Sequence, residues 1–175
     1  ALALCTVSGV PLGAILGLTR IPGRRLVTAI LYTGMGLPPV VVGLFVYLLL
    51  SRSGPLGSLG WLFTPRAMVL AQTIISFPLV TGLTMAAVQS VDPSFRQQMR
   101  CLGATRLQEI WALLREARLG VVAGIIAAFG SIISEVGAVM LVGGNIAGKT
   151  RVLTTAIVLN TRHSRRVLPS DPPPL

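Results

Sequence analysis

Residues 67–89 read AMVLAQTIISFPLVTGLTMAAVQ, an apolar stretch that contains no charged side chain. A helix rises about 1.5 Å per residue, so a stretch of this length can cross a hydrocarbon layer of roughly 30 Å. Pro78 lies near its middle, and in a membrane bundle neighbouring helices and hydroxyl side chains can satisfy the carbonyl group that a proline leaves free. The stretch therefore predicts a transmembrane helix with a kink or a break at Pro78, whether or not that feature serves transport.

Three more stretches are long and apolar, and they cover residues 1–18, 26–50 and 119–142. The second is interrupted by Gly36 and by Pro38-Pro39, where we expect another kink or break. A fifth apolar piece, residues 152–160, is too short to cross a membrane alone. The pattern predicts an all-α fold, a polytopic bundle of transmembrane helices over residues 1–162.

The composition excludes an ordinary soluble domain. Of 175 residues, 53% are hydrophobic and 11% are charged, against about 25% charged in soluble proteins; the mean hydropathy is +0.79. The net charge of +10 comes from arginines beside the apolar stretches, and only 5% of residues are aromatic. Nucleic acid is therefore not the expected partner, whereas anionic lipid head groups and membrane topology explain the basic residues.

The two ends lead us to expect a truncated chain. It starts at Ala1 without a basic leader, so residues 1–18 are interpreted as the remainder of a transmembrane helix rather than as a signal peptide. Residues 163–175 run into a proline-rich segment that we expect to be irregular and disordered. Cys5 and Cys101 do not suggest a disulfide framework.

The loops between the stretches predict the orientation. Loops 20–25 and 90–118 are the most basic, with Arg20, Arg24, Arg25, Arg96, Arg100, Arg106, Arg115 and Arg118, whereas loop 51–66 has only Arg52 and Arg66. If every stretch crosses, the two basic loops share one side, which the positive-inside rule makes cytoplasmic. The segment after residue 142 then falls outside, in conflict with its basic residues Lys149, Arg151, Arg162, Arg165 and Arg166.

Residues 92–118, DPSFRQQMRCLGATRLQEIWALLREAR, predict two short cytoplasmic helices. Asp92 can cap a first helix that begins with the following proline. Gly103 allows a tight turn, and Thr105 with Gln108 makes a capping box for a second helix.

Four apolar residues on this second helix share one face by their spacing: Leu107, Ile110, Trp111 and Leu114. Such a stripe suits insertion into a groove on another protein. It is equally compatible with packing on the protein's own helices or with lying along the membrane surface.

The same loop resembles the coupling segment of ABC importer permeases, whose motif reads E-A-A, three residues, Gly, and nine residues before I-x-L-P. The motif glycine falls at Gly103, and the apolar position at Leu113 also fits. The other motif positions differ here, namely Gln97, Gln98 and Met99 at the start and Arg115 and Glu116 at the end. The resemblance implies that a separate ATPase engages this loop through Gln97, Gln98, Met99, Gly103, Ala104 and Leu113.

Residues 134–162, SEVGAVMLVGGNIAGKTRVLTTAIVLNTR, closely resemble permeases of the tungstate importer type, which are related to the molybdate and sulfate permeases. The resemblance covers most of the chain, including the GLPP of residues 36–39, but lacks a final helix after residue 162. It implies a homodimer in the plasma membrane beneath an extracytoplasmic oxyanion-binding protein. It also implies that the chain is no enzyme and binds no cofactor or metal, because a partner ATPase uses ATP and Mg²⁺.

Residues 143–150, GGNIAGKT, match the P-loop pattern G-x-x-x-x-G-K-[ST]. A P-loop needs a preceding strand and an acidic residue that helps to hold magnesium, but a stretch of transmembrane length precedes this one and the only acid downstream is Asp171. We therefore do not expect nucleotide binding. The segment is either an anion-attracting loop near the outer mouth or a plain solvated loop; its candidate residues are Gly143, Gly144, Asn145, Lys149 and Arg151.

Glu135 is the only acid within an apolar stretch and lies close to Ser131 and Ser134. A carboxyl group at membrane depth is costly, so it should face the bundle interior with a partner or a proton. These three residues are candidates for gating or for the subunit interface. Glu135 is equally interpretable as a structural acid that binds a backbone amide at a helix break, and like charge argues against direct binding of an anion.

The leading hypothesis is the membrane subunit of an ATP-driven oxyanion importer, with tungstate as substrate and molybdate or sulfate as alternatives, working by alternating access. An autonomous secondary transporter or channel is the runner-up, and a single intramembrane acid offers little for proton or sodium coupling. A structural membrane scaffold is a third hypothesis, which periodicity alone does not exclude.

Overall fold

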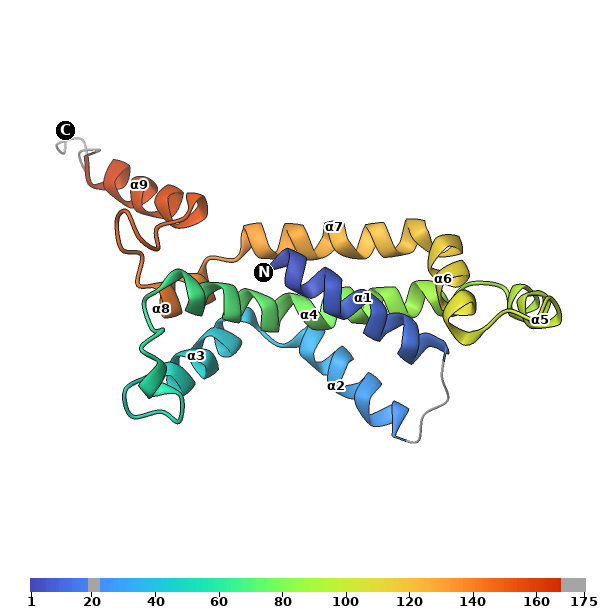
Figure 1. Cartoon of the computed structure of the whole chain (residues 1–175). Helices are drawn as coiled ribbons and strands as arrows, with labels where there is room; N and C mark the ends of the chain where they lie inside the picture. The colour runs from blue at the N-terminus through green and yellow to red at the C-terminus, as the bar shows by residue number, and fades with distance from the viewer. Residues whose placement is uncertain (19–22, 168–175) are drawn as a thin grey trace.

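The computed structural model describes residues 1–18 and 23–167, and these residues form helices and no strand. Figure 1 shows the 25-residue helix α4 (Pro65–Gln89) running along the bundle, with α1 (Leu2–Leu18) and α7 (Arg118–Ser134) beside it. The prediction of an all-α bundle is confirmed. Arg20 and residues 168–175, which include most of the expected irregular tail, lie outside the described residues.

Helix α4 corresponds to the apolar stretch 67–89 and continues through Pro78 without a break. Pro65 begins it, at a position where the missing N–H costs nothing. By length and composition, α4 is the one described helix that can cross a membrane by itself. The number rises to three if two sharply bent helix pairs, α2 with α3 and α6 with α7, each count as one span.

The stretch 26–50 forms two helices, α2 (Arg24–Gly36) and α3 (Pro39–Leu50), which meet at an angle of 103°. Leu37 and Pro38 between them are extended, with ψ of 131° and 126°. A residue that precedes proline is driven out of the helical region by the proline ring. The consecutive prolines therefore break the helix rather than kink it.

The stretch 119–142 is also divided between two helices. Helix α7 ends at Ser134, Glu135 is extended, and a seven-residue helix, α8 (Gly137–Gly143), follows. The last helix, α9 (Leu153–Val167), is longer than the expected apolar piece 152–160 and continues helical structure into the segment expected to be irregular.

Close packing of α1 on α4 depends on glycines of α1 spaced four residues apart, Gly9, Gly13 and Gly17. A Cβ atom at Gly13 would lie 2.5 Å from the carbonyl oxygen of Thr81 on α4. Small residues at this spacing let two membrane helices bring their backbones together. The same face of α4 buries three hydroxyl groups that make no hydrogen bond, those of Ser76, Thr81 and Thr84.

The loops gather at two opposite ends of the bundle. At one end, α5 (Pro93–Cys101) and α6 (Arg106–Glu116) form a helical hairpin, and at the other lie α3, α8 and α9 (Figure 1). The segment after α8 meets the loop before α4, because the Phe63 N–H donates to the carbonyl of Val142 at 2.9 Å. Loop 51–66 and the segment after α8 therefore lie at the same end of the bundle.

Candidate functional site

Both helices of the hairpin begin with the caps that the sequence predicts. The Asp92 carboxylate accepts the Ser94 N–H at 2.7 Å, and this bond holds the pKa of Asp92 below its usual value. At α6, the Gln108 N–H donates to the Thr105 hydroxyl at 3.4 Å, while the Thr105 N–H donates to Gln108 Oε1 at 2.8 Å. These caps satisfy N–H groups that have no partner inside a helix, so local sequence alone determines where both helices start.

The turn between the two helices requires a glycine. Gly103 has φ of +75°, a left-handed conformation that side chains disfavour, and no other atom lies within 4 Å of the place of its missing Cβ. The Ala104 N–H then donates back to the Met99 carbonyl at 3.0 Å. Among the expected coupling residues, Gln97 and Gln98 are exposed, whereas Met99 and Ala104 are half-buried.

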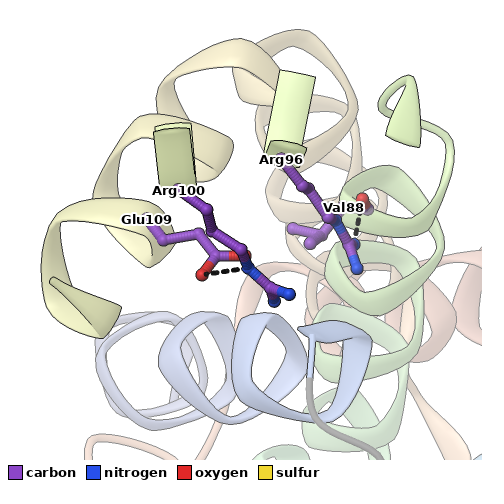
Figure 2. Close-up of polar contacts among 4 residues, drawn as sticks. All are labelled: Val88, Arg96, Arg100 and Glu109. Atoms are coloured by element: carbon purple, nitrogen blue, oxygen red, sulfur yellow. Dashed lines mark hydrogen bonds and ion pairs between the residues drawn. The ribbon is translucent and has the colours of Figure 1, made fainter. Parts of the chain in front are cut away.

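An ion pair joins the two helices of the hairpin (Figure 2). The Nη2 of Arg100 on α5 lies 3.2 Å from Oε1 of Glu109 on α6. Glu109 is 8% exposed, but the side chain of Arg100 is 68% exposed, so the pair is screened by water on one side. Sequence reasoning missed this contact. Opposite charges on either side of a predicted tight turn are the signal that could have suggested it.

The predicted apolar stripe of α6 is divided between two environments. Ile110 and Leu114 pack, together with the fully buried Leu113, into a core cluster formed with α1, α4 and α7. Leu107 and Trp111, by contrast, are 79% and 69% exposed. The packing interpretation therefore applies to Ile110 and Leu114, whereas Leu107 and Trp111 are free to contact a partner protein or the membrane surface.

Leu102, at the tip of the hairpin, is 82% exposed and extends the same apolar surface. We call Leu102, Leu107 and Trp111 the coupling surface. Large exposed apolar side chains on a rigid, capped hairpin are typical of a surface that docks in a partner's groove.

Glu135 lies at the break between α7 and α8. Its Oε1 accepts the N–H of Ala138 at 2.8 Å, and the residue is 9% exposed. The hydroxyl of Ser134 donates to the carbonyl of Ser131 at 3.2 Å. The carboxylate thus satisfies a backbone amide at a helix break, which is the contact that the structural interpretation of this acid predicts.

The two broken helices cross beside their breaks. A Cβ at Gly137, the first residue of α8, would lie 2.6 Å from the side chain of Val40 in the first turn of α3. One turn further, a Cβ at Gly43 would lie 2.6 Å from Cα of Ala138. The helix interruptions of two separate spans therefore come together, and glycines permit that contact.

The GGNIAGKT segment is an internally bonded loop that follows α8, not a strand. The hydroxyl of Thr150, which is 2% exposed, donates to the Gly143 carbonyl at 2.6 Å and accepts the Ile146 N–H at 2.9 Å. The hydroxyl that a P-loop uses for magnesium is engaged here by the loop itself.

The remaining candidate residues of this loop lie around that closure. Gly144 and Asn145 are left-handed, with φ of 70° and 49°, whereas Lys149 and Arg151 are exposed to solvent. The loop between α8 and α9, which carries both cations, lies at the end of the bundle opposite the hairpin (Figure 1).

A family model described as "Binding-protein-dependent transport system inner membrane component" matches residues 9–162. The chain belongs to this family. It is thus a permease subunit of an ABC transporter and a membrane protein, as the resemblance of its coupling segment indicated.

Curated relatives agree with this assignment. The chain is 46% identical over 167 residues to the "Probable anion ABC transporter permease protein" of Haloferax volcanii, and the aligned region covers 93% of this chain and 72% of that protein. It is 42% identical over 159 residues to the tungstate uptake system permease protein TupB of Peptoclostridium acidaminophilum, with 91% and 70% covered. The molybdenum transport system permease protein ModB of Escherichia coli K12 is 32% identical over 144 residues, with 78% and 63% covered.

Proposed function

We propose that this chain is the membrane-spanning permease subunit of an ATP-driven importer for tungstate. Relatives named for tungstate uptake share 42% and 36% of their aligned residues with it, and the molybdenum permease shares 32%. The partners in this proposal are an ATP-binding-cassette ATPase, an extracytoplasmic oxyanion-binding protein and a second copy of the chain, assembled in the cell membrane.

The observation that carries the proposal is the coupling surface. Leu102, Leu107 and Trp111 are exposed at the end of the bundle, although the same helix, α6, anchors Leu113 in the core. Exposed apolar side chains on a secured helix gain free energy when a groove of another protein covers them. We assign this groove to the ATPase, which places the hairpin in the cytoplasm.

The route from the coupling surface to the translocation pathway runs through α7. Helix α6 passes into α7 at Ala117 with a bend of 71°, and α7 ends at Ser134, just before the place where α8 crosses α3. When the ATPases close, the hairpins move, and this movement shifts the crossing of the two broken helices. Lys149 and Arg151 at the other end attract the anion before it enters.

The docking test compares two leucines with the same exposure. Leu107 on the coupling surface and Leu153 at the start of α9 are both 79% exposed. Truncation of an anchoring side chain at an interface costs roughly 1–2 kcal/mol, or about a tenfold loss of affinity. The Leu107→Ala variant should therefore retain much less ATPase on co-purification, whereas Leu153→Ala should retain as much as the native chain.

Equal retention by the two variants would contradict docking at the coupling surface. Uptake into proteoliposomes tests the substrate, with tungstate, molybdate and sulfate as competing anions. Uptake that needs neither ATP nor the ATPase would instead identify an autonomous transporter.

A further inference from the structure

Arg96 of α5 reaches back to the end of the spanning helix α4. Its Nη2 donates to the carbonyl of Val88 at 3.2 Å, a contact between residues eight positions apart (Figure 2). Val88 is fully buried and lies in the last turn of α4, where carbonyl groups have no partner within the helix. A cation at this end of a helix also interacts favourably with the helix dipole.

The bond completes a cap that involves three consecutive carbonyl groups. The carbonyls of Ala86 and Ala87 accept the N–H and the hydroxyl of Ser90, at 3.0 and 2.8 Å. The next carbonyl, that of Val88, is the one that Arg96 binds. The C-terminus of α4 is thus closed partly by its own chain and partly by the first helix of the hairpin.

The guanidinium group is confined in this position. Arg96 is half-buried, and its Nε is buried without a hydrogen-bond partner. An unpaired buried donor is unfavourable, so the bond from Arg96 to the Val88 carbonyl offsets part of the cost of burying this side chain. The pattern differs from that of Arg100 on the same helix, whose side chain is 68% exposed and pairs within the hairpin.

The connection that Arg96 bridges is short and not helical. Residues 90–92 link α4 to α5, and Asp92 is extended with ψ of 129°. Backbone torsions in such a linker allow α5 to turn relative to α4, in the manner of a hinge. A side chain that bonds across the linker from α5 to α4 restricts this rotation.

We propose that Arg96 is a positioning residue that fixes the α5–α6 hairpin to α4, so that movement of the hairpin turns α4 instead of being absorbed by the linker. The inference rests on the proposed function. Its importance comes from α4, against which α1, α2, α3, α7 and α8 all pack. A displacement of α4 would therefore reach every one of these helices.

The test uses the complex of the permease with its ATPase in proteoliposomes and measures tungstate taken up per ATP hydrolysed. The variants are Arg96→Ala, Arg96→Gln and Arg96→Lys, with Arg25→Ala as a control for loss of one positive charge, because Arg25 is exposed at the start of α2. Loss of a hydrogen bond from a charged group corresponds to about a tenfold effect or more.

We expect the Ala and Gln variants to retain the ATPase and its hydrolysis rate while uptake per ATP falls about tenfold. The Lys variant should recover most of the ratio, because an ammonium group can donate to the same carbonyl, and the control should keep the native ratio. An unchanged ratio in the Ala or Gln variant would overturn the inference. So would failure of both to assemble with the ATPase, since Arg96 would then serve folding or docking rather than transmission.

Absence of ATP-driven uptake by the native complex is a different result. It would refute the proposed function, and the inference would fall with it. If only the Arg96 variants lose uptake per ATP while the native complex transports normally, the proposed function stands and the role of Arg96 is supported.

Discussion

Glu135 combines a buried carboxylate with a helix break, and two substitutions separate its structural role from a role in gating. Glu135→Gln retains an acceptor oxygen for the Ala138 N–H but removes the charge. Glu135→Ala removes both. The structure favours the structural role, because Oε1 already accepts that N–H at 2.8 Å.

The expected magnitudes follow from burial. Ala138 is fully buried, so removal of the acceptor leaves an unpaired amide that costs about 1–3 kcal/mol. Glutamine is a weaker hydrogen-bond acceptor than a carboxylate, which lowers the stability of the variant by about 1 kcal/mol. Removing a charge from a residue that is 9% exposed raises the stability, so the two effects oppose each other. We therefore expect the Gln variant to lie within about 1 kcal/mol of the native stability.

Two measurements check this expectation. Unfolding in mixed detergent micelles, followed by circular dichroism, gives the stability difference between the variants. Tungstate uptake per ATP in proteoliposomes gives the functional effect, which should be close to native for Glu135→Gln. A Gln variant as stable as the native chain but with uptake reduced about tenfold or more would refute the structural account, because only the charge would then explain the loss.

Two further predictions concern packing and capping. In the same unfolding assay, Gly13→Ala should be about 1–3 kcal/mol less stable than Gly130→Ala, although both substitutions gain the same helix propensity. A Cβ at Gly13 would meet the backbone of α4, whereas nothing lies within 4 Å of a Cβ at Gly130. Equal stabilities of the two variants would show that α1 does not need this close approach. The lowered pKa of Asp92 means that its cap contributes fully at neutral pH and that this contribution is lost as pH falls through the folded-state value, below 3.8. Asp92→Asn should therefore flatten the dependence of hairpin stability on pH from about 5 downward through the ordinary carboxyl value, and an unchanged pH profile would contradict the assignment.

The parts of the fold that depend on neighbouring residues could be predicted from the sequence. The caps at Asp92 and Thr105 and the turn at Gly103 all form as expected, because each involves residues at most three positions apart or the backbone of a single residue. The break after Gly36 likewise follows from two adjacent prolines.

The break at Glu135 was predicted only as one of two interpretations of this acid. No proline marks it, and the residues from 119 to 142 are continuously apolar apart from this one acid. The helix stops there because the carboxylate caps α8 and because Gly137 and Ala138 accept the close approach of α3. The approach of α3 joins residues about 95 positions apart, Gly43 and Ala138, whereas the bond from the Ala138 N–H to Glu135 spans three positions.

The coupling segment was likewise predicted in part from the sequence and in part visible only in the structure. The motif resemblance identified the loop, but the contacts that secure it, from Arg96 to Val88 and from Arg100 to Glu109, became visible only in three dimensions. Spacing also placed Leu107 and Leu114 on one face of α6, although Leu114 packs half-buried against the bundle and Leu107 remains exposed.

The amino-acid sequence by itself determined that this is a membrane protein, that it is helical and where its hairpin lies. Hydrophobicity and helix capping are properties of short segments, so local sequence suffices for all three. Tertiary structure alone decided where α3 and α8 approach each other, which apolar residues remain exposed and which arginine reaches α4. These outcomes depend on how closely distant backbones can approach, and that distance is set jointly by residues from different helices.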